Sequence, residues 1–211
     1  MPVKRKPRTY NSELRSAAAE ETRARIVASA RAVFAAGEVA FSLDGVARHA
    51  GVTRLTVYNQ FESRRGLLEA VFDDMAEEGG LFGLPSVLAH SDPDEALRRF
   101  VTVFCRFWNQ YGSVVPRFAA VAKLDDEIAE SLRERTERRR MGLTALVRRL
   151  DISAASAQAD LVDILFALTS FEFYEALNVR NRSVKTIERL TQRLVADTVA
   201  HFRARAEHGG E

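Results

Sequence analysis

Apolar residues recur at helical spacing along most of this chain, and the pattern predicts helices nearly throughout. Between Phe41 and Leu68, two short apolar stripes flank a tight turn at Ala50-Gly51-Val52. The first stripe repeats every three or four residues and comprises Leu43, Val46, Ala47 and Ala50. The second comprises Val52, Val57 and Phe61. The stripes predict two short helices that pack against each other across the turn.

Capping residues define the ends of this predicted helix pair. Ser42 precedes the first helix, where its hydroxyl accepts from free backbone N–H groups. Gly51 follows the last turn, where a left-handed backbone strains any residue that has a Cβ. Thr53 is placed to cap the second helix, which runs to about Phe61. The sequence therefore predicts a helix-turn-helix.

The outer face of the second helix carries side chains suited to nucleic acid. Those expected to be exposed are Arg54, Leu55, Thr56, Tyr58, Asn59 and Gln60. Arginine binds guanine and asparagine binds adenine through paired hydrogen bonds, and apolar groups contact the thymine methyl. Tyr58 and Gln60 suit phosphate oxygens. The plain alternative is two core helices with an ordinary solvated face.

The remaining chain also predicts helices. A fourth helix has an apolar stripe from Leu67 to Met75 and ends at Gly79-Gly80, and residues 81–92 are expected to form a loop or short turn. Asp92 and Pro93 resemble an N-cap followed by proline at the first helical position. The later helices are predicted over residues 93–111, 114–123, a long charged helix from Asp125, 156–178 and 183–205.

Charge is unevenly distributed. The chain has 211 residues and a net charge of +2, but residues 1–65 hold 12 Lys and Arg against 6 Asp and Glu, a net of +6. Residues 66–211 hold 19 against 23, a net of −4. A basic N-terminal third favours binding of a polyanion through that end. A solvated charge run is the alternative.

The first 20 residues combine prolines with the basic cluster Lys4, Arg5, Lys6 and Arg8, and they lack an apolar period. We expect an extended, flexible arm. Such an arm lies on phosphates or enters a minor groove in some DNA readers, and in other proteins it is a tail without a fixed role.

Cysteine usage and hydropathy indicate a cytoplasmic location. The single Cys105 excludes a disulfide within one chain, and no signal peptide is recognised. No apolar run approaches the roughly 20 residues that a membrane span needs.

No set of catalytic residues is evident. The histidines His49, His90, His201 and His208 are scattered without metal-ligand spacing, and no phosphate-binding glycine motif or nucleophile motif occurs. The acidic cluster at residues 125–127 is explained by the start of a helix, where negative charge complements the dipole. We expect neither an enzyme nor a metal or cofactor.

Residues 21–75 resemble the DNA-binding domain of the TetR/AcrR family of bacterial regulators. The shared pattern comprises Thr22-Arg23-Ala24-Arg25-Ile26-Val27 through Phe34, Val46-Ala47, Ala50-Gly51-Val52-Thr53, Thr56-Val57-Tyr58, Phe61, Ser63-Arg64 and Leu67-Leu68. Two departures occur. The turn between Phe34 and Ser42 is one residue shorter than the common form, with Phe41 where threonine is frequent, and Leu55 stands where a small residue or proline is common.

The resemblance implies roles for particular residues. It places Arg54, Leu55, Thr56 and Asn59 near base edges, and Tyr58 and Arg64 on phosphates, with arginine at the last position where lysine is more usual. The full set of DNA-binding candidates is Ser42, Thr53, Arg54, Leu55, Thr56, Tyr58, Asn59, Gln60 and Arg64.

The resemblance also implies a homodimer through the last two helices and a cavity for a small effector. The dimer would present two recognition helices about 34–36 Å apart to a palindromic operator on double-stranded DNA. The candidate effector-binding residues are Phe104, Phe107, Trp108, Arg117, Phe118, Phe166, Phe173 and Tyr174. The alternatives are plain core for the aromatic residues and a surface charge for Arg117.

The sequence thus predicts an all-α regulator with three parts: a basic arm over residues 1–20, a three-helix DNA-binding domain over 21–65, and a helical effector-binding and dimerisation domain over 66–211. The predicted function is that of a repressor released from its operator by an apolar or aromatic effector. The alternatives are an activator, a regulator without an effector, an architectural protein that reads A·T-rich shape, and a helical enzyme with an aromatic pocket.

Overall fold

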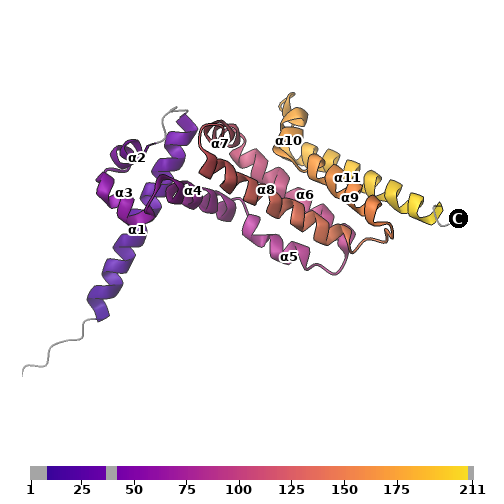
Figure 1. Ribbon diagram of the computed structural model, residues 1–211, viewed down its shortest axis with the longest axis horizontal. Coiled ribbons are helices and arrows are strands. Elements are labelled where there is room, and N and C mark those ends of the chain that lie inside the picture. The colour runs from indigo at the N-terminus through magenta and orange to yellow at the C-terminus, as the bar shows by residue number, and fades with distance from the viewer. Residues whose placement is uncertain (1–8, 37–41, 209–211) are drawn as a thin grey trace, which may run out of the picture. The chain divides into compact units, whose positions relative to one another are not determined.

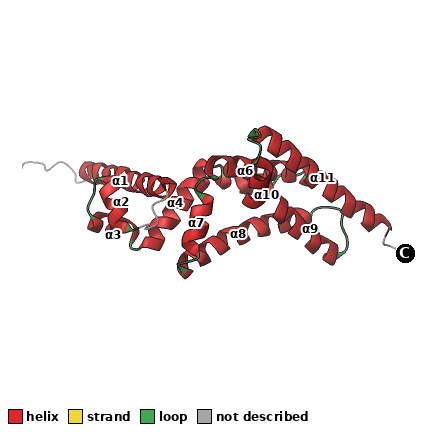
Figure 2. Cartoon of the chain, turned by 90° about the horizontal axis from the view of Figure 1, so that it is seen from above, coloured by secondary structure: helices red, strands yellow, loops and turns green. Residues whose placement is uncertain are grey.

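The computed structural model describes residues 9–36 and 42–208, which form helices joined by short turns and loops (Figure 1). No strand occurs in this part of the chain, as Figure 2 shows. The predicted all-α class is therefore confirmed. The chain divides into two compact units, Met1–Asp74 and Met75–Glu211.

The first unit is built from the N-terminal helices. They are α1 Thr9–Ala36, α2 Leu43–Ala50, α3 Arg54–Phe61 and most of α4 Arg64–Glu78. The predicted helix-turn-helix is α2 and α3, with the boundaries that their capping residues indicate. Residues 37–41, where the shortened turn was predicted, lie outside the described residues.

The prediction of an extended arm over residues 1–20 is wrong from Thr9 onward, because α1 begins there. The basic, proline-containing segment ends at Arg8, and residues 1–8 lie outside the described range. The segment that follows includes Ala17-Ala18-Ala19-Glu20, and alanine and glutamate have high helix propensity. The composition of residues 1–20 taken together does not indicate this helix, because the basic cluster precedes it.

All four helices of the first unit contribute to its core. Ile26 and Ala30 of α1, Val46 of α2, Val57 of α3 and Leu67 of α4 are fully buried. Full burial of such an aliphatic side chain contributes about 1.5–3 kcal/mol relative to exposure. An isolated helix of eight residues is not stable in water, so α2 and α3 depend on this shared packing.

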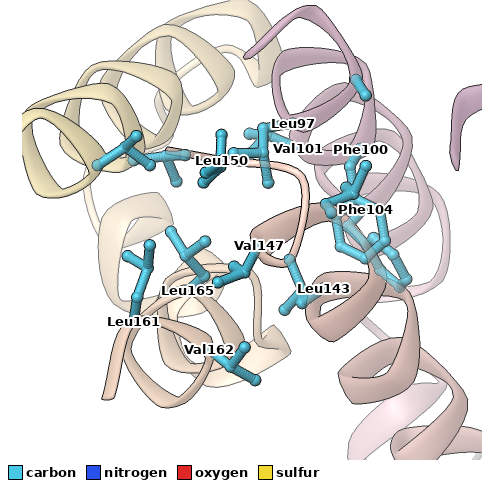
Figure 3. Packing of buried hydrophobic residues seen from close by; sticks show 14 of the residues in the cluster. Leu97, Phe100, Val101, Phe104, Leu143, Val147, Leu150, Leu161, Val162 and Leu165 are labelled. Atoms are coloured by element: carbon cyan, nitrogen blue, oxygen red, sulfur yellow. The ribbon is translucent and has the colours of Figure 1, made fainter. Parts of the chain in front are cut away.

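The second unit continues from the end of α4 through the C-terminal helices. They are the 3-10 turn η1 Leu81–Gly83, α5 Leu84–Leu88, α6 Pro93–Tyr111, α7 Val115–Ala122, α8 Asp126–Val147, α9 Ala155–Leu168, α10 Phe171–Asn178 and α11 Val184–His208. Helix α6 contacts α5, α8, α10 and α11, and its buried face lies at the centre of the core. In Figure 3, Phe100 and Phe104 of α6 lie near Leu143 of α8.

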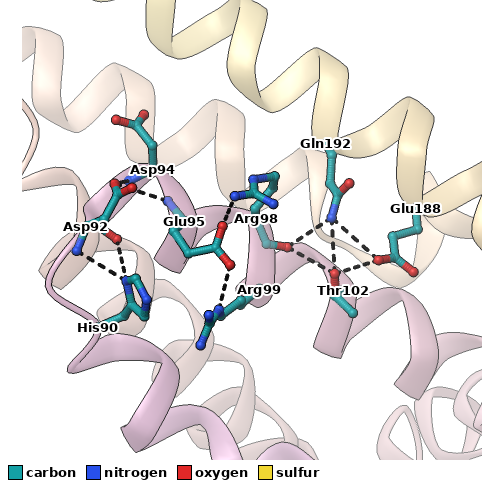
Figure 4. Close-up of polar contacts among 9 residues, drawn as sticks. All are labelled: His90, Asp92, Asp94, Glu95, Arg98, Arg99, Thr102, Glu188 and Gln192. Atoms are coloured by element: carbon teal, nitrogen blue, oxygen red, sulfur yellow. Dashed lines mark hydrogen bonds and ion pairs between the residues drawn. The ribbon is translucent and has the colours of Figure 1, made fainter.

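Local chemistry determines where α6 and α8 begin. The Asp92 carboxylate accepts from the backbone N–H groups of Asp94 and Glu95 at 2.9 and 3.3 Å, and Pro93 occupies the first turn (Figure 4). Asp125 accepts from Ile128 N–H at 3.2 Å. The N-cap predicted at Asp92 and the helix start predicted at Asp125 are both confirmed.

Two of the predicted elements are wrong. Residues 81–92 were predicted as a loop or short turn, but η1 and α5 occupy most of this segment, and Leu84 and Leu88 pack against the core. The continuous helix predicted over 156–178 is instead α9 and α10. The Thr169 hydroxyl donates to Leu165 O, and the Ser170 hydroxyl caps α10 by accepting from Phe173 N–H at 3.1 Å. Such side-chain bonds to the backbone compete with helix continuation.

Polar contacts connect α6 with α11. The Thr102 hydroxyl donates to the Glu188 carboxylate at 2.6 Å, and the Gln192 amide donates to Thr102 Oγ1 at 3.1 Å (Figure 4). Nearer the C-terminus, Arg203 donates to both carboxylate oxygens of Asp94, at 3.1 and 2.9 Å. These contacts lie beside the buried face of α11 formed by Ile187, Val195 and Val199.

Among the described helices, none combines the length and the apolar character that a membrane crossing requires.

Candidate nucleic-acid interface

The turn between α2 and α3 is closed by backbone hydrogen bonds around Gly51. Gly51 has φ 65°, its N–H donates to Arg48 O at 3.3 Å, and Val52 N–H donates to Ala47 O at 3.0 Å. This pair of bonds is the Schellman arrangement at a helix C-terminus. The glycine therefore determines the direction in which the chain leaves α2 and enters α3.

Helix α3 begins at the predicted cap. Thr53 Oγ1 accepts from Thr56 N–H at 3.1 Å, and the Thr53 and Thr56 hydroxyls lie 2.8 Å apart within hydrogen-bond distance. Ser42 caps α2 in the same way by accepting from Gly45 N–H at 3.1 Å. Both hydroxyls therefore have a structural role as caps, beside the DNA contact predicted for each of them.

The remaining candidate residues occupy one face of α3 and the start of α4. Arg54, Leu55, Tyr58 and Asn59 are exposed, whereas Val57 and Phe61 on the opposite side are buried. Thr56, Gln60 and Arg64 are half-buried. An exposed leucine and tyrosine beside arginine and asparagine present both apolar contact area and directional donors.

Arg23 of α1 is a residue that the face pattern did not single out. Its guanidinium donates from Nη1 to Gln60 O at 2.8 Å, and its Cζ lies 4.4 Å from the centroid of the Phe61 ring. A cation at a helix C-terminus satisfies carbonyls and complements the dipole. Arg23 therefore fixes the C-terminal end of α3 to α1. No local spacing signals a contact between residues 37 positions apart.

The start of α4 closes against the end of α3. Ser63 caps α4 by accepting from Gly66 N–H at 3.0 Å. A Cβ on Gly66 would lie well under 3.0 Å from the Phe61 carbonyl oxygen, closer than real Cβ atoms approach. Glycine at this position lets the backbones of the two helices approach closely.

Most aromatic members of the predicted effector site lie in the packed interior of the second unit. Phe104, Phe107, Phe118 and Tyr174 are buried, whereas Trp108, Arg117, Phe166 and Phe173 are half-buried. Ring centroids are 5.9 Å apart for Phe104 and Trp108 and 5.0 Å apart for Phe107 and Trp108. The Tyr174 hydroxyl donates to Asn109 at 3.0 Å. Phe104, Phe107 and Trp108 therefore pack against one another.

Arg139 lies among these rings. Its Cζ is 4.0 Å from the Phe166 centroid and 5.8 Å from the Phe104 centroid, and Nη1 donates to Phe166 O at 3.0 Å and to Thr169 Oγ1 at 3.2 Å. Burial lowers the pKa of Arg139 to about 10, so the side chain remains charged at neutral pH. With Trp108 Nε1, which donates to Thr169 O at 3.0 Å, it satisfies the carbonyls at the α9 C-terminus.

A surface groove of about 870 Å³ runs along α8. Its apolar lining is Leu132, Met141 and Phe166, and its polar lining includes Arg133, Arg138 and Arg140 together with Glu130, Glu134, Thr136 and Glu137. Phe166 is the member of the predicted effector set that lines it. Arg140 stacks on this ring, with Cζ 4.1 Å from the centroid, and forms an ion pair with Asp163.

The described residues contain no group of three or more His, Cys, Asp or Glu side chains suited to a metal ion.

One family model matches the segment of the first unit that contains the helix-turn-helix. The family model described as bacterial regulatory proteins, tetR family, matches residues 26–71. This match covers α2 and α3 completely, together with parts of α1 and α4. No match was found among curated protein sequences.

Solved structures extend the similarity over most of the chain. A TetR/AcrR-type transcriptional regulator from Aquifex aeolicus VF5 has a TM-score of 0.60 at 15% identity, covering 83% of this chain and 98% of its own. A protein assigned to the TetR family from Mesorhizobium loti has a TM-score of 0.61 at 17% identity, covering 86% and 96%. A Clostridium perfringens protein assigned to regulation of fatty acid metabolism has a TM-score of 0.60 at 18% identity, covering 82% and 97%.

These structures share the fold, and the family model matches the segment in which Gly51, Thr53 and the exposed face of α3 are found. TetR family regulators are in general non-enzymatic DNA-binding proteins that typically form dimers. Residues 26–71 of this chain thus match the model of the tetR family of bacterial regulatory proteins, α2 and α3 lie within the matched segment, and the chain shares the fold of the TetR-type regulators.

Proposed function

We propose that this chain acts as a homodimer that binds a palindromic operator and represses transcription until a small apolar or aromatic effector releases it. The observation that carries the proposal is the exposed face of α3, on which Arg54, Leu55, Tyr58 and Asn59 lie opposite a buried face. An exposed recognition helix in a unit with excess positive charge has the composition that base and phosphate contacts require.

Within this proposal, the candidate residues divide by chemistry. Arg54 and Asn59 have paired donors or acceptors for base edges, and Leu55 provides apolar surface for a thymine methyl. Tyr58 and Arg64 contact phosphates and set the register of α3 on the duplex. We expect base-contacting residues to determine which sequence is bound and phosphate-contacting residues to determine how tightly any sequence is bound.

Dimerisation is supported by apolar side chains that remain accessible on α9 and α11. Ile164 is 39% exposed and Leu194 is 42% exposed, although neighbouring residues of the same helices, such as Leu165 and Val195, are buried. The helices therefore have more apolar surface than the core of one chain covers. A second copy of the same surface would bury the remainder, as an isologous interface requires.

The dimer is tested with Leu194→Glu, which places a charge on the proposed interface. We expect this variant to sediment as a folded monomer. Leu124→Glu is the matched control, because Leu124 is 86% exposed at the start of the α7–α8 turn, and it should remain dimeric. A dimeric Leu194→Glu variant would place the interface elsewhere.

The effector is proposed to bind in the second unit, and α4 is proposed to transmit its effect, because α4 begins in the first unit and ends in the second. The groove along α8 offers apolar Leu132, Met141 and Phe166 beside three arginines, which suits an apolar molecule with an acidic end. Since the Clostridium perfringens protein of similar fold is assigned to fatty acid metabolism, a fatty acid is the first probe. A coupling of about 1–3 kcal/mol would lower operator affinity roughly 5- to 150-fold.

The decisive experiment is selection of bound fragments from sheared genomic DNA by the purified protein at near-physiological salt. A recurrent palindrome is the expected result. The double variant Tyr58→Phe with Arg64→Ala should lose the bound fragments while keeping its helical content and dimeric state. Arg205→Ala, which removes an exposed guanidinium from α11, is the matched control and should still select the palindrome.

The other outcomes are equally informative. The recovered fragments could share no motif, and still share none after the protein is refolded to remove any co-purified ligand. That result would contradict sequence-specific binding and favour an architectural role. A palindrome whose affinity is indifferent to every ligand tested would contradict the effector. A palindrome at which transcription rises upon binding would identify an activator.

A further inference from the structure

One ion pair joins the two helices of the helix-turn-helix on its exposed side. Arg54 is the first residue of α3 and Asp44 is the second residue of α2. Arg54 Nη1 lies 3.7 Å from Asp44 Oδ2, and the two side chains are 69% and 57% exposed. The contact therefore involves a proposed base-reading residue and a carboxylate on the neighbouring helix.

Stability of the fold does not explain this pair. An ion pair between two exposed side chains contributes little, because water and salt screen it. Arg54 also stands in the first turn of α3, where a positive charge opposes the helix dipole. Asp44, in contrast, stands in the first turn of α2, where its charge is favourable without a partner. The cation is thus placed against its local preference and beside a carboxylate that does not need it.

We propose that Asp44 is a positioning residue for base recognition: it holds the Arg54 guanidinium toward base edges and away from phosphates, and so sets a preference for guanine at one position of each half-site. The inference rests on the proposed function, namely sequence-specific binding of double-stranded DNA through α3.

The chemistry of guanidinium supports this role. Arginine has five N–H donors in a fixed plane, so a carboxylate 3.7 Å from Nη1 attracts that edge of the guanidinium while other donors stay available. Two of them match O6 and N7 of guanine. The pair is also neutral as a unit, which weakens the attraction of Arg54 to phosphates. Without Asp44, a long flexible cation at the DNA surface can pair with any phosphate, and such contacts carry no sequence information.

Removal of Asp44 distinguishes positioning from simple repulsion, because the two predict different results. If the carboxylate only repels DNA, Asp44→Asn raises affinity for all sequences equally and leaves base preference unchanged. If it positions Arg54, the same variant raises affinity for unrelated sequences and lowers the preference for guanine. A freed Arg54 would also make the logarithmic salt dependence steeper by about one per protomer.

The test compares wild type, Asp44→Asn, Arg54→Ala and the double variant. Each protein is used to select from a randomised duplex library, and the dissociation constant is then measured for the selected duplex and for duplexes with single base-pair changes. Arg54→Ala should lower the preference at one symmetric position by about 5- to 150-fold. Asp44→Asn should lower it at the same position at least fivefold and should have no further effect once Arg54 is absent.

Three further variants remove ambiguity. Glu62→Gln deletes one exposed negative charge at the other end of α3 and should leave the preference at that position unchanged. Asp44→Glu keeps a carboxylate and should retain most of the preference for guanine. Asp44→Ala, checked for helical content, replaces Asp44→Asn if the asparagine variant folds poorly.

The proposal is overturned if Asp44→Asn leaves the guanine preference intact, or if the loss persists in the Arg54→Ala background. If wild type selects a palindrome but Arg54→Ala keeps every base preference, Arg54 is not a reader, and the role of Asp44 is rejected while sequence-specific binding stands. If wild type selects no shared sequence, the proposed function fails and this inference fails with it.

Discussion

Gly66→Ala is the substitution that most directly tests how α4 supports α3. In an unconstrained helix, alanine in place of glycine stabilises by about 1 kcal/mol. Here the new Cβ would overlap the Phe61 carbonyl oxygen, which is backbone and cannot rotate away. Moving the new Cβ and this oxygen apart to ordinary contact distance displaces the end of α3 or the start of α4. Overpacking of this kind costs about 1–3 kcal/mol.

The displacement also weakens the cap of α4, because Gly66 N–H donates to the Ser63 hydroxyl at 3.0 Å. Loss of such a cap costs about 0.5–2 kcal/mol. The helix-propensity gain offsets part of these costs, so we expect a net destabilisation of about 1–3 kcal/mol. For a chain of 211 residues this corresponds to a fall in Tm of roughly 3–10 °C.

Thermal unfolding followed by circular dichroism measures the stability effect, and titration of the selected duplex measures the effect on DNA binding. Most of the protein remains folded after such a loss, so a drop in operator affinity reports displacement of α3. Gly83→Ala is the matched control: its Cβ would meet no atom within 4 Å and its φ is −77°. That variant should be stabilised by up to about 1 kcal/mol. An unchanged or higher Tm for Gly66→Ala would refute the close-approach argument.

Substitutions at two further positions and one labelling experiment test other parts of the structure. Thr53→Ala removes the N-cap of α3 and should cost about 1 kcal/mol and weaken operator binding, whereas Thr53→Ser keeps the hydroxyl and should bind like wild type in the same titration. Phe100→Ala empties a fully buried site of the second unit, so urea unfolding should show that the free energy of unfolding falls by about 3–5 kcal/mol. A fall below 1 kcal/mol would mean that the core collapses around the site. Burial raises the pKa of Cys105 to about 11, so about 0.1% of this side chain is thiolate at pH 8. Because the thiolate is the reactive form, iodoacetamide should label Cys105 only after unfolding. Rapid labelling of the native protein would contradict the burial.

Helix boundaries could be predicted from the sequence where a short-range bond defines them. Ser42, Thr53, Asp92 and Asp125 each cap a helix through a backbone N–H two or three residues ahead, and Gly51 ends α2 through its own positive φ. All the atoms involved lie within a few residues of one another. Residue type and position are therefore sufficient to predict them.

Other boundaries depend on partners that are distant in the sequence. The break between α9 and α10 leaves carbonyls that Arg139 of α8 and Trp108 of α6 satisfy, across 27 to 61 residues of chain. Apolar periodicity continues through Thr169 and Ser170, so the pattern alone predicts one continuous helix. The competing side-chain bonds become favourable only when those partners are in place.

In the candidate interface, too, local features could be predicted from the sequence and distant contacts could not. Periodicity predicted which side of α3 is buried, and the burial of Val57 and Phe61 agrees with it. Periodicity did not predict the partners that hold this helix, because Arg23 reaches Gln60 from α1 and Asp44 reaches Arg54 from α2. Long flexible side chains of this kind have no fixed spacing relative to their partners.

Under the proposed function, the precision of base reading also depends on the residues that hold α3 in place. Helix α3 has eight residues, too few to be stable alone in water. It is held at its start by the Thr53 cap, at its end by Arg23 and the close approach of Gly66, and from beneath by Val57 and Phe61. A loss of about 1.4 kcal/mol at any one of these points lowers the ratio of correctly placed to displaced helix tenfold. Substitutions at these supports are thus expected to alter operator affinity while every DNA-contacting side chain remains present.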